Sequence, residues 1–339
     1  MPNQNVGYGR ALLDAVATQV PAFGRVFVVF NSLDTKEAYD SMSNVMKTDT
    51  DGKVRFFTSL STAVDAADTN NNDVICLDGQ TSHKVSSMLA VSKNRVHFIG
   101  FDGGGKRVEN QRTLISNTGA GAEADTAMVK VTGTGVTFRN IAFKNNWTVA
   151  QNLYCVDDQS SNGYFENCTI HNLGSAHLTN ANCAVLRLSS QDTTYVNCQI
   201  GADTLKSTVA SGQVVLIKKQ TTAATRVKLI DCYFRAYTDK TTHVFIRVAA
   251  NGDIDRSVTL IRPVFDNFNW DASNGGALMA VAVASASGLV SGGINLFDVM
   301  LNGKGTTDVA SSAVGNAGVW ITGNSPTAGT AGISVQAIA

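Results

Sequence analysis

The stretch Gly163-Tyr-Phe-Glu-Asn-Cys-Thr-Ile170 decides the fold of this 339-residue chain. It reads as a short strand, one polar residue and a second short strand. Five further stretches share this order: Val136–Phe143 (VTFRNIAF), Thr193–Ile200 (TTYVNCQI), Val227–Phe234 (VKLIDCYF), Val258–Phe265 (VTLIRPVF) and Ile294–Leu301 (INLFDVML). They recur about every 30 residues, a period that indicates a solenoid when the repeats consist of strands.

A second series of apolar strands alternates with the first. Its members are Met128–Val131, Leu153–Val156, Ala184–Leu188, Val214–Ile217, Val244–Val248, Met279–Ala282 and Val319–Ile321. Each repeat therefore supplies three short strands, which make one rung of a parallel β-helix. Each strand is expected to pair with its counterpart in the next rung, and alternate side chains are expected to fill the interior.

A polar residue occupies the bend between the two strands of each stretch. The residues of this column are Asn140, Asn167, Asn197, Asp231, Arg262 and Asp298. An asparagine here can bond to its counterpart one rung on and satisfy the backbone of the bend. We therefore predict a bend ladder of Asn140, Asn167, Asn197, Asp231 and Asp298. Three of the residues that follow are cysteines, which predicts an interior column of small apolar side chains.

This pattern resembles the right-handed, pectate-lyase-like β-helix family over roughly residues 73–323. It is most similar to the β-helix structural proteins of tailed-phage virions. The resemblance implies an all-β solenoid of about seven rungs, a homotrimer, and an N-terminal arm that binds the particle. The scaffold carries lyases, hydrolases and inert virion proteins alike, so the resemblance does not fix an activity.

The organisation along the chain follows from where the repeats begin and end. We expect an arm or attachment segment at 1–57, a capping helix and β-helix at 58–323, and a tail at 324–339. Leu60, Ala63, Val64 and Ala67 lie on one face of the expected helix, and Ser59 can cap it. Such a helix would cover the open end of the solenoid.

The charge balance, the apolar runs and the cysteines of the chain limit the classes of function to consider. The chain has 27 basic and 27 acidic residues, which gives no electrostatic case for nucleic acid. No apolar run approaches the length of a membrane span, and the N-terminus lacks a secretion signal. The six cysteines show no metal-binding spacing and predict free, buried thiols. We expect no metal and no cofactor, and assembly in the host cytoplasm into a virion without export.

Asp157 and Asp158 are the best catalytic candidates if the chain is an enzyme, with His171 nearby. They follow a strand where glycosidases similar to polygalacturonases place acid pairs, and glycoside hydrolysis uses two carboxyl groups. The chain lacks the Asn-Thr-Asp and Gly-His-Gly elements of that family. We therefore favour a solvated polar turn without catalytic residues.

Trp147 and Trp270 each follow a strand of their rung. Exposed aromatic residues on the flank of a β-helix can stack on sugars or anchor a subunit interface. Loop residues folded back over the solenoid are the equal alternative. The apolar run at 276–284 suggests a strand with both faces covered, which favours contact with another subunit.

Three functions remain. The favoured one is a phage virion structural protein, a capsid decoration or head-fibre protein that binds the major capsid protein or another virion component through its N-terminal region. The alternative is a tail-spike depolymerase, a hydrolase or lyase that acts on bacterial surface glycan. The third is a sugar-binding adhesin, which the lack of an export signal disfavours.

Overall fold

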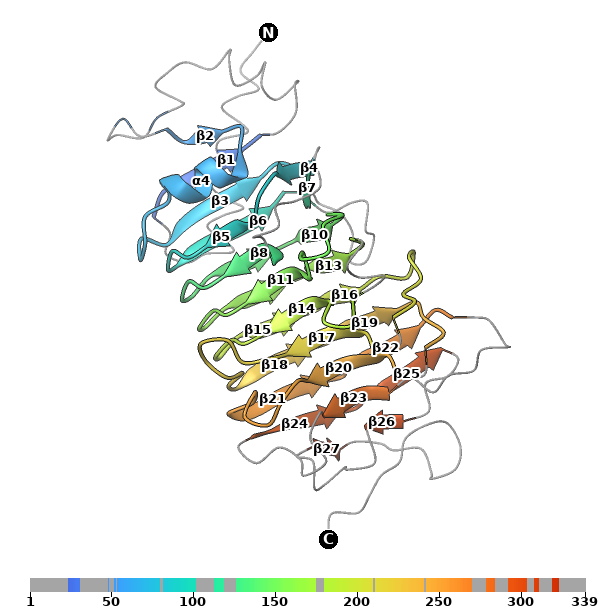
Figure 1. The fold of residues 1–339 in the computed structure, drawn as a ribbon. Coiled ribbons are helices and arrows are strands. Elements are labelled where there is room, and N and C mark those ends of the chain that lie inside the picture. The colour runs from blue at the N-terminus through green and yellow to red at the C-terminus, as the bar shows by residue number, and fades with distance from the viewer. Residues whose placement is uncertain are drawn as a thin grey trace.

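The fold was analysed in a computed structural model. The structure describes residues 24–30, 48, 52, 54–79, 82–101, 113–118, 126–174, 180–209, 211–240, 242–269, 279–283, 292–303, 308–310 and 319–322. Within these residues three parallel sheets wind around one core (Figure 1). The fold class predicted from the sequence, a parallel β-helix solenoid, is confirmed.

The first sheet has eleven strands among the described residues. In spatial order they are β2 (Phe56–Phe57), β1 (Val26–Val29), β3 (Asp73–Leu77), β6 (Val96–Gly100), β9 (Thr137–Arg139), β12 (Tyr164–Glu166), β15 (Thr194–Val196), β18 (Val227–Ile230), β21 (Arg256–Ile261), β24 (Gly292–Phe297) and β27 (Val319–Thr322). From β3 onward, neighbours in this sheet come from successive rungs, as a solenoid requires.

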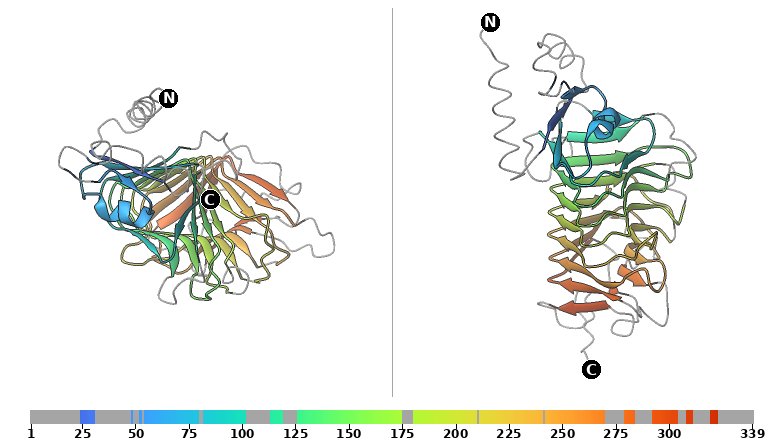
Figure 2. Two further views of the ribbon diagram at one scale, coloured as in Figure 1. Left: turned by 90° about the horizontal axis from the view of Figure 1, so that it is seen from above. Right: turned by 90° about the vertical axis from the view of Figure 1, so that its left-hand side faces the viewer.

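The second and third sheets each have eight strands among the described residues. The second contains β25 (Met300–Gly303), β22 (Val264–Asn267), β19 (Tyr233–Ala236), β16 (Gln199–Gly201), β13 (Thr169–Asn172), β10 (Ile141–Asn145), β7 (Thr113–Asn117) and β4 (Ser82–Val85). The third contains β26 (Asp308–Ala310), β23 (Met279–Val283), β20 (Val244–Val248), β17 (Gln213–Ile217), β14 (Ala184–Leu188), β11 (Tyr154–Asp158), β8 (Ala127–Val131) and β5 (Leu89–Val91). Figure 2 shows the rungs stacked along one axis.

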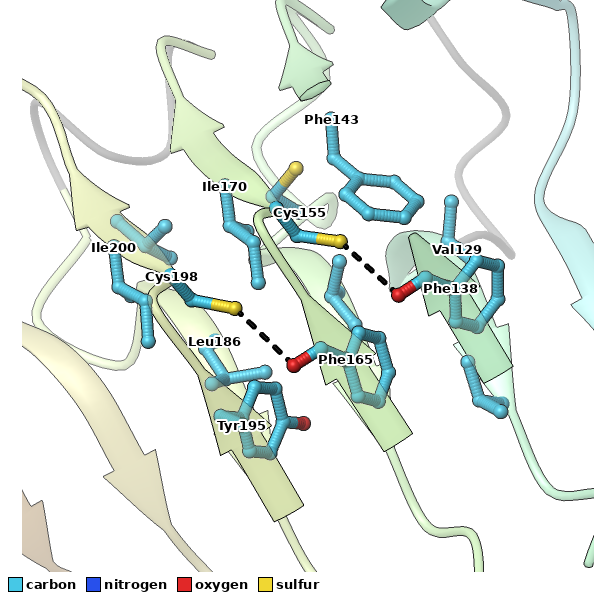
Figure 3. Close-up of a cluster of buried hydrophobic side chains, with 14 of the residues drawn as sticks. Val129, Phe138, Phe143, Cys155, Phe165, Ile170, Leu186, Tyr195, Cys198 and Ile200 are labelled. Atoms are coloured by element: carbon cyan, nitrogen blue, oxygen red, sulfur yellow. Dashed lines mark hydrogen bonds between the residues drawn. The ribbon is translucent and has the colours of Figure 1, made fainter. Parts of the chain in front are cut away.

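The core is a stack of identical positions in successive rungs. Phe138 of β9 lies opposite Phe165 of β12, which in turn lies opposite Tyr195 of β15. The ring centroids are 5.0 Å apart for Phe138 and Phe165, and 4.5 Å apart for Phe165 and Tyr195 (Figure 3). Parallel strands in register bring like side chains within ring-stacking distance, so one interior column becomes an aromatic stack.

The bend column has the geometry that its residue types favour. The φ angles of Asn140, Asn167, Asn197 and Asp231 are 57°, 52°, 52° and 54°. This left-handed region is open to Asn and Asp at lower cost than to most side chains. Asn167 Nδ2 donates to Asn140 Oδ1 at 3.2 Å, and Asn197 Nδ2 donates to Asn167 Oδ1 at 2.6 Å. These bonds join three consecutive rungs at the bend.

Further along the bend column, an ion pair joins two rungs. Arg262 has a φ of 50° and donates from Nε to Asp231 Oδ1 at 2.6 Å and from Nη2 to Asp231 Oδ2 at 2.8 Å. Asp298 occupies the same left-handed bend one rung further, with φ of 53°. The arginine in this column therefore acts as a bend residue whose side chain reaches the previous rung.

The cysteines are free and buried, as the sequence predicts. Cys168, Cys198 and Cys232 form the interior column beside the bend, and the Sγ–H of Cys198 donates to the carbonyl of Phe165 at 3.5 Å (Figure 3). Burial raises the pKa of Cys155 to about 12. These thiols act as small apolar side chains of the core.

The capping helix is α4 (Leu60–Ala66), which lies at the N-terminal end of the stack (Figure 1). Leu60, Ala63 and Val64 are buried against the core, as the sequence pattern predicts. Ser59 holds the N-cap position but makes no side-chain capping bond, so the predicted cap is wrong in that detail.

Two other segments differ from the sequence prediction. The sequence pattern places the strand at 319–321 in the second series, but β27 pairs with β24 of the first sheet, through Ile294 and Val319. The third-sheet position of that rung belongs to β26. In addition, β1 and β2 extend the first sheet beyond β3, so this sheet begins inside the segment predicted to be an arm.

Candidate functional site

Asp157 lies in strand β11 and is tied to the next rung. It is opposite Arg187 of β14, whose Nε donates to Asp157 Oδ1 at 2.7 Å and whose Nη2 donates to Oδ2. Gln159 Nε2 also donates to Oδ2, at 2.7 Å. Asp157 is fully buried, and the guanidinium of Arg187 lies 4.4 Å from the ring centroid of Tyr154. The charge of the Asp157 carboxylate is therefore paired with that of Arg187, and the side chain is held between two rungs.

The pKa of Arg187 is consistent with its pairing with Asp157. Burial alone would lower the pKa of the guanidinium, but the hydrogen bonds and negative charge of Asp157 outweigh it, and the pKa is raised. Two charges removed from water stabilise a fold only when they are paired and hydrogen-bonded. This pair meets that condition.

Asp158 is enclosed in the core. Its Oδ1 accepts from the backbone N–H of Ser160 at 3.0 Å and from the Ser160 hydroxyl at 2.6 Å. Its Oδ2 accepts from the Tyr195 hydroxyl at 2.8 Å, and Tyr195 belongs to the aromatic stack. Burial raises the pKa of Asp158, although these donors oppose the shift. Asp158 therefore holds the turn that follows β11 in place and fixes the position of the Tyr195 hydroxyl.

These contacts correct the prediction of a solvated turn. Asp157 and Asp158 are the last residues of a strand, and both side chains are fully buried. His171, the third candidate, lies in β13 of the second sheet and is also buried. In this arrangement Asp157 is bound to an arginine and Asp158 to the core, so neither carboxyl group is presented to a polysaccharide on the surface.

Trp147 does not form an exposed sugar platform. Its side chain is fully buried within the core, and its Nε1 donates to the carbonyl of Thr118 at 3.3 Å. The alternative prediction, a residue folded back over the solenoid, describes it correctly. Trp270 lies outside the described residues, as do the side chains of β23 in the apolar run.

A groove on the second sheet is a further candidate site. It encloses about 660 Å³ and crosses four strands, β16, β19, β22 and β25. Gln199, Tyr233, Val264 and Met300 form one column of its floor, each in register with the next. Arg235 and Asn302 flank this column, while Asp231, Arg262 and Phe268 complete the lining. Volumes of this size are typical of small-molecule sites.

The polar side chains of the groove are held by their neighbours. The hydroxyl of Tyr233 donates to Asp266 Oδ2. Arg235 donates from Nη1 to Asp203 Oδ2 at 2.7 Å and from Nη2 to Gln199 Oε1 at 3.3 Å. The guanidinium of Arg235 lies 5.9 Å from the ring centroid of Tyr233. The groove is therefore pre-organised, which lowers the entropic cost of binding.

The ionisation of the groove follows from the same contacts. Burial and the bond to Asp266 raise the pKa of Tyr233, so the phenol stays protonated at neutral pH. The hydrogen bonds from Arg262 lower the pKa of Asp231, although slight burial opposes the shift. The groove then presents a neutral phenol and paired opposite charges.

Sequence reasoning missed this site. Tyr233 and Arg235 flank the buried Phe234, an alternation that marks two outward positions on one strand. Val264 and Met300 occupy the Tyr233 position in the next two rungs. Alignment of the outward positions of each repeat identifies the floor residues, whereas a pair of neighbouring acidic residues in the sequence does not mark them.

The described residues contain no candidate metal site and no candidate membrane-spanning helix. No group of three or more His, Cys, Asp and Glu side chains is arranged to hold a metal ion there. Within the same described ranges, no helix is long and apolar enough to cross a membrane.

Comparisons with known proteins bear on the fold. A pectin methylesterase from carrot superimposes with a TM-score of 0.56 at 13% sequence identity, over 92% of this chain and 86% of that chain. The chain shares the parallel β-helix fold of this protein. ORF18 of Geobacillus virus E2 gives a TM-score of 0.44 at 13% identity, over 80% of this chain and 55% of that chain. An alginate lyase from Paenibacillus gives 0.44 at 15% identity, over 81% and 94%.

Searches by sequence gave no match to any protein-family model or curated protein. At such low identity, structural similarity establishes the scaffold, and function has to be argued from this chain's own residues.

Proposed function

We propose that this protein is a structural component of a tailed-bacteriophage particle, in which the β-helix is a stiff shaft. The observation that supports this best is the use of polar side chains as ties between rungs. Asn167 bonds to Asn140 across one step, and Arg187 bonds to Asp157 across another. Polar and charged side chains that could act in catalysis here connect neighbouring rungs of the β-helix.

The specific role we propose is capsid decoration or a head fibre. Residues 1–57 would attach the protein to the major capsid protein or another virion component, and three copies would assemble into a trimer in the host cytoplasm. The pattern of three short strands and a polar bend in each repeat, which is similar to that of virion β-helix proteins, supports this assignment. The pairing of β1 with β3 supports an attachment segment that is anchored on the first rung.

The experiment is a measurement of mass and shape in solution. Light scattering and small-angle X-ray scattering would be applied to the full chain and to a variant without residues 1–23. This deletion ends before Arg25, which bonds to the buried Asp73 beside β1. We expect an elongated trimer for the full chain, and retention of the trimer when the leading residues are removed. A monomeric full chain would contradict the proposal.

A polysaccharide-cleaving enzyme is the second candidate, and the groove on the second sheet is the observation that favours it. Its carboxylates are already engaged, because Asp231 accepts from Arg262 and Asp266 accepts from Tyr233. Release of reducing ends from bacterial surface polysaccharides would test this candidate. Activity that is lost in Asp231→Asn but kept in Lys144→Ala would establish it.

A further inference from the structure

We infer that the groove on the second sheet binds an uncharged, hydroxyl-rich oligosaccharide. The inference concerns binding only, so it holds whether the chain is a virion shaft or an enzyme. Its basis is the combination of floor, charge and aromatic surface in one groove of about 660 Å³.

The floor suits an extended ligand that runs along the solenoid axis. Gln199, Tyr233, Val264 and Met300 come from four adjacent strands in one register column. Neighbouring strands lie about 4.8 Å apart, so the column is about 14 Å long. A short chain of sugar rings fits that length.

The apolar surface of the groove matches the faces of sugar rings. Tyr233 and Phe268 are partly exposed aromatic residues, and Met300 is 55% exposed. An aromatic side chain provides a flat contact surface at low entropic cost, and methionine adapts to irregular shapes. Together with Val264, these residues make up the apolar part of the lining.

The polar groups are planar side chains that can bind neighbouring hydroxyl groups. Arg262 and Asp231 form a bidentate pair, and their side chains are 56% and 45% exposed. Asn302 is exposed on β25 beside the floor column. Guanidinium, carboxylate and amide groups together supply both donors and acceptors, as hydroxyl groups require.

The charge balance points to an uncharged ligand. Arg235 and Arg262 are bound to Asp203 and Asp231, and Asp266 adds a further carboxylate at Tyr233. A uronate or phosphate would need a cation that is not already paired, and would meet the field of these carboxylates. A neutral sugar avoids that repulsion and can bind the paired groups as they stand.

The test is titration calorimetry of the full chain with three neutral hexasaccharides, namely maltohexaose, cellohexaose and mannohexaose, and with hexagalacturonate as the acidic comparison. We expect at least one neutral hexasaccharide to bind, and hexagalacturonate to bind much more weakly. Tyr233→Ala should weaken the neutral binding by about tenfold or more, because it removes the aromatic floor.

Two further variants make the result decisive. Met300→Ala changes an exposed groove residue without touching the core, and should also weaken binding. Lys144→Ala changes the same sheet at β10, outside the groove, and should leave the affinity unchanged. The inference is overturned if no neutral hexasaccharide binds, if hexagalacturonate binds as tightly, or if both groove variants bind like the wild type.

Discussion

The bend ladder gives the sharpest prediction on stability. Asn197 has a φ of 52° and donates from Nδ2 to Asn167 Oδ1 at 2.6 Å. Replacement by leucine removes this bond, worth about 1 kcal/mol, and places a bulky side chain in the left-handed region at a cost of about 1–2 kcal/mol. We therefore expect Asn197→Leu to lower the free energy of unfolding by about 2–3 kcal/mol.

A second substitution separates the two contributions. Asn197→Gly also removes the amide bond, but glycine adopts the left-handed region without strain. It should therefore be less destabilising than Asn197→Leu by about 1–2 kcal/mol. Asn146→Leu, at an exposed position whose φ is not left-handed, is the matched control and should change little.

The assay is urea unfolding followed by circular dichroism. The midpoints should fall in the order wild type, Asn197→Gly, Asn197→Leu. Equal midpoints for the glycine and leucine variants would refute the role of backbone strain. A wild-type midpoint for Asn197→Gly would refute the contribution of the hydrogen-bond ladder.

Three further outcomes follow from buried groups. Burial raises the folded-state pKa of Asp158 above its ordinary value of 3.8, so its contribution to stability is fully present below pH 3.8 and is lost as pH rises through the raised pKa. Urea unfolding across this range should show the wild type losing stability relative to Asp158→Asn as pH rises; a constant difference would contradict the shift. The six buried thiols, with the pKa of Cys155 at about 12, should react with a thiol reagent only after unfolding, and rapid labelling of the native protein would contradict their burial. Trp147→Ala should lower the unfolding free energy by about 3–5 kcal/mol in thermal or urea melts and leave glycan affinity intact; a stable variant that loses glycan binding would reverse the assignment.

Much of the fold was predictable because each rung repeats the same sequence pattern of a short strand, a polar bend residue and a second short strand. The bend residues at Asn140, Asn167 and Asn197 mark where the chain turns, and the apolar alternation on either side marks the strands. Such signals are local, so a single sequence carries them. The assignment of 319–321 to the wrong sheet shows where this reasoning fails. The short strand β26 has a weak apolar pattern, and one missed strand shifts every later assignment by one sheet.

The site was harder to predict because it depends on pairing between rungs. Asp157 and Asp158 look like a polar turn in the sequence, yet the partners that bury them, Arg187 and Tyr195, lie one rung on. The groove has the same origin, since its floor takes one residue from each of four strands. No short motif contains such a set, and only the register between rungs assembles it.

The central claim is that the strongest catalytic candidate is a structural tie, and a double-mutant cycle on Asp157 and Arg187 tests it most directly. Asp157 is fully buried, so Arg187→Met leaves its charge unpaired and should lower the unfolding free energy by about 3–5 kcal/mol. In Asp157→Leu/Arg187→Met no unpaired charge remains, and the double variant should be more stable than the sum of the single changes predicts. Additive single effects, within about 0.5 kcal/mol, would contradict the claim and return Asp157 to the list of functional residues.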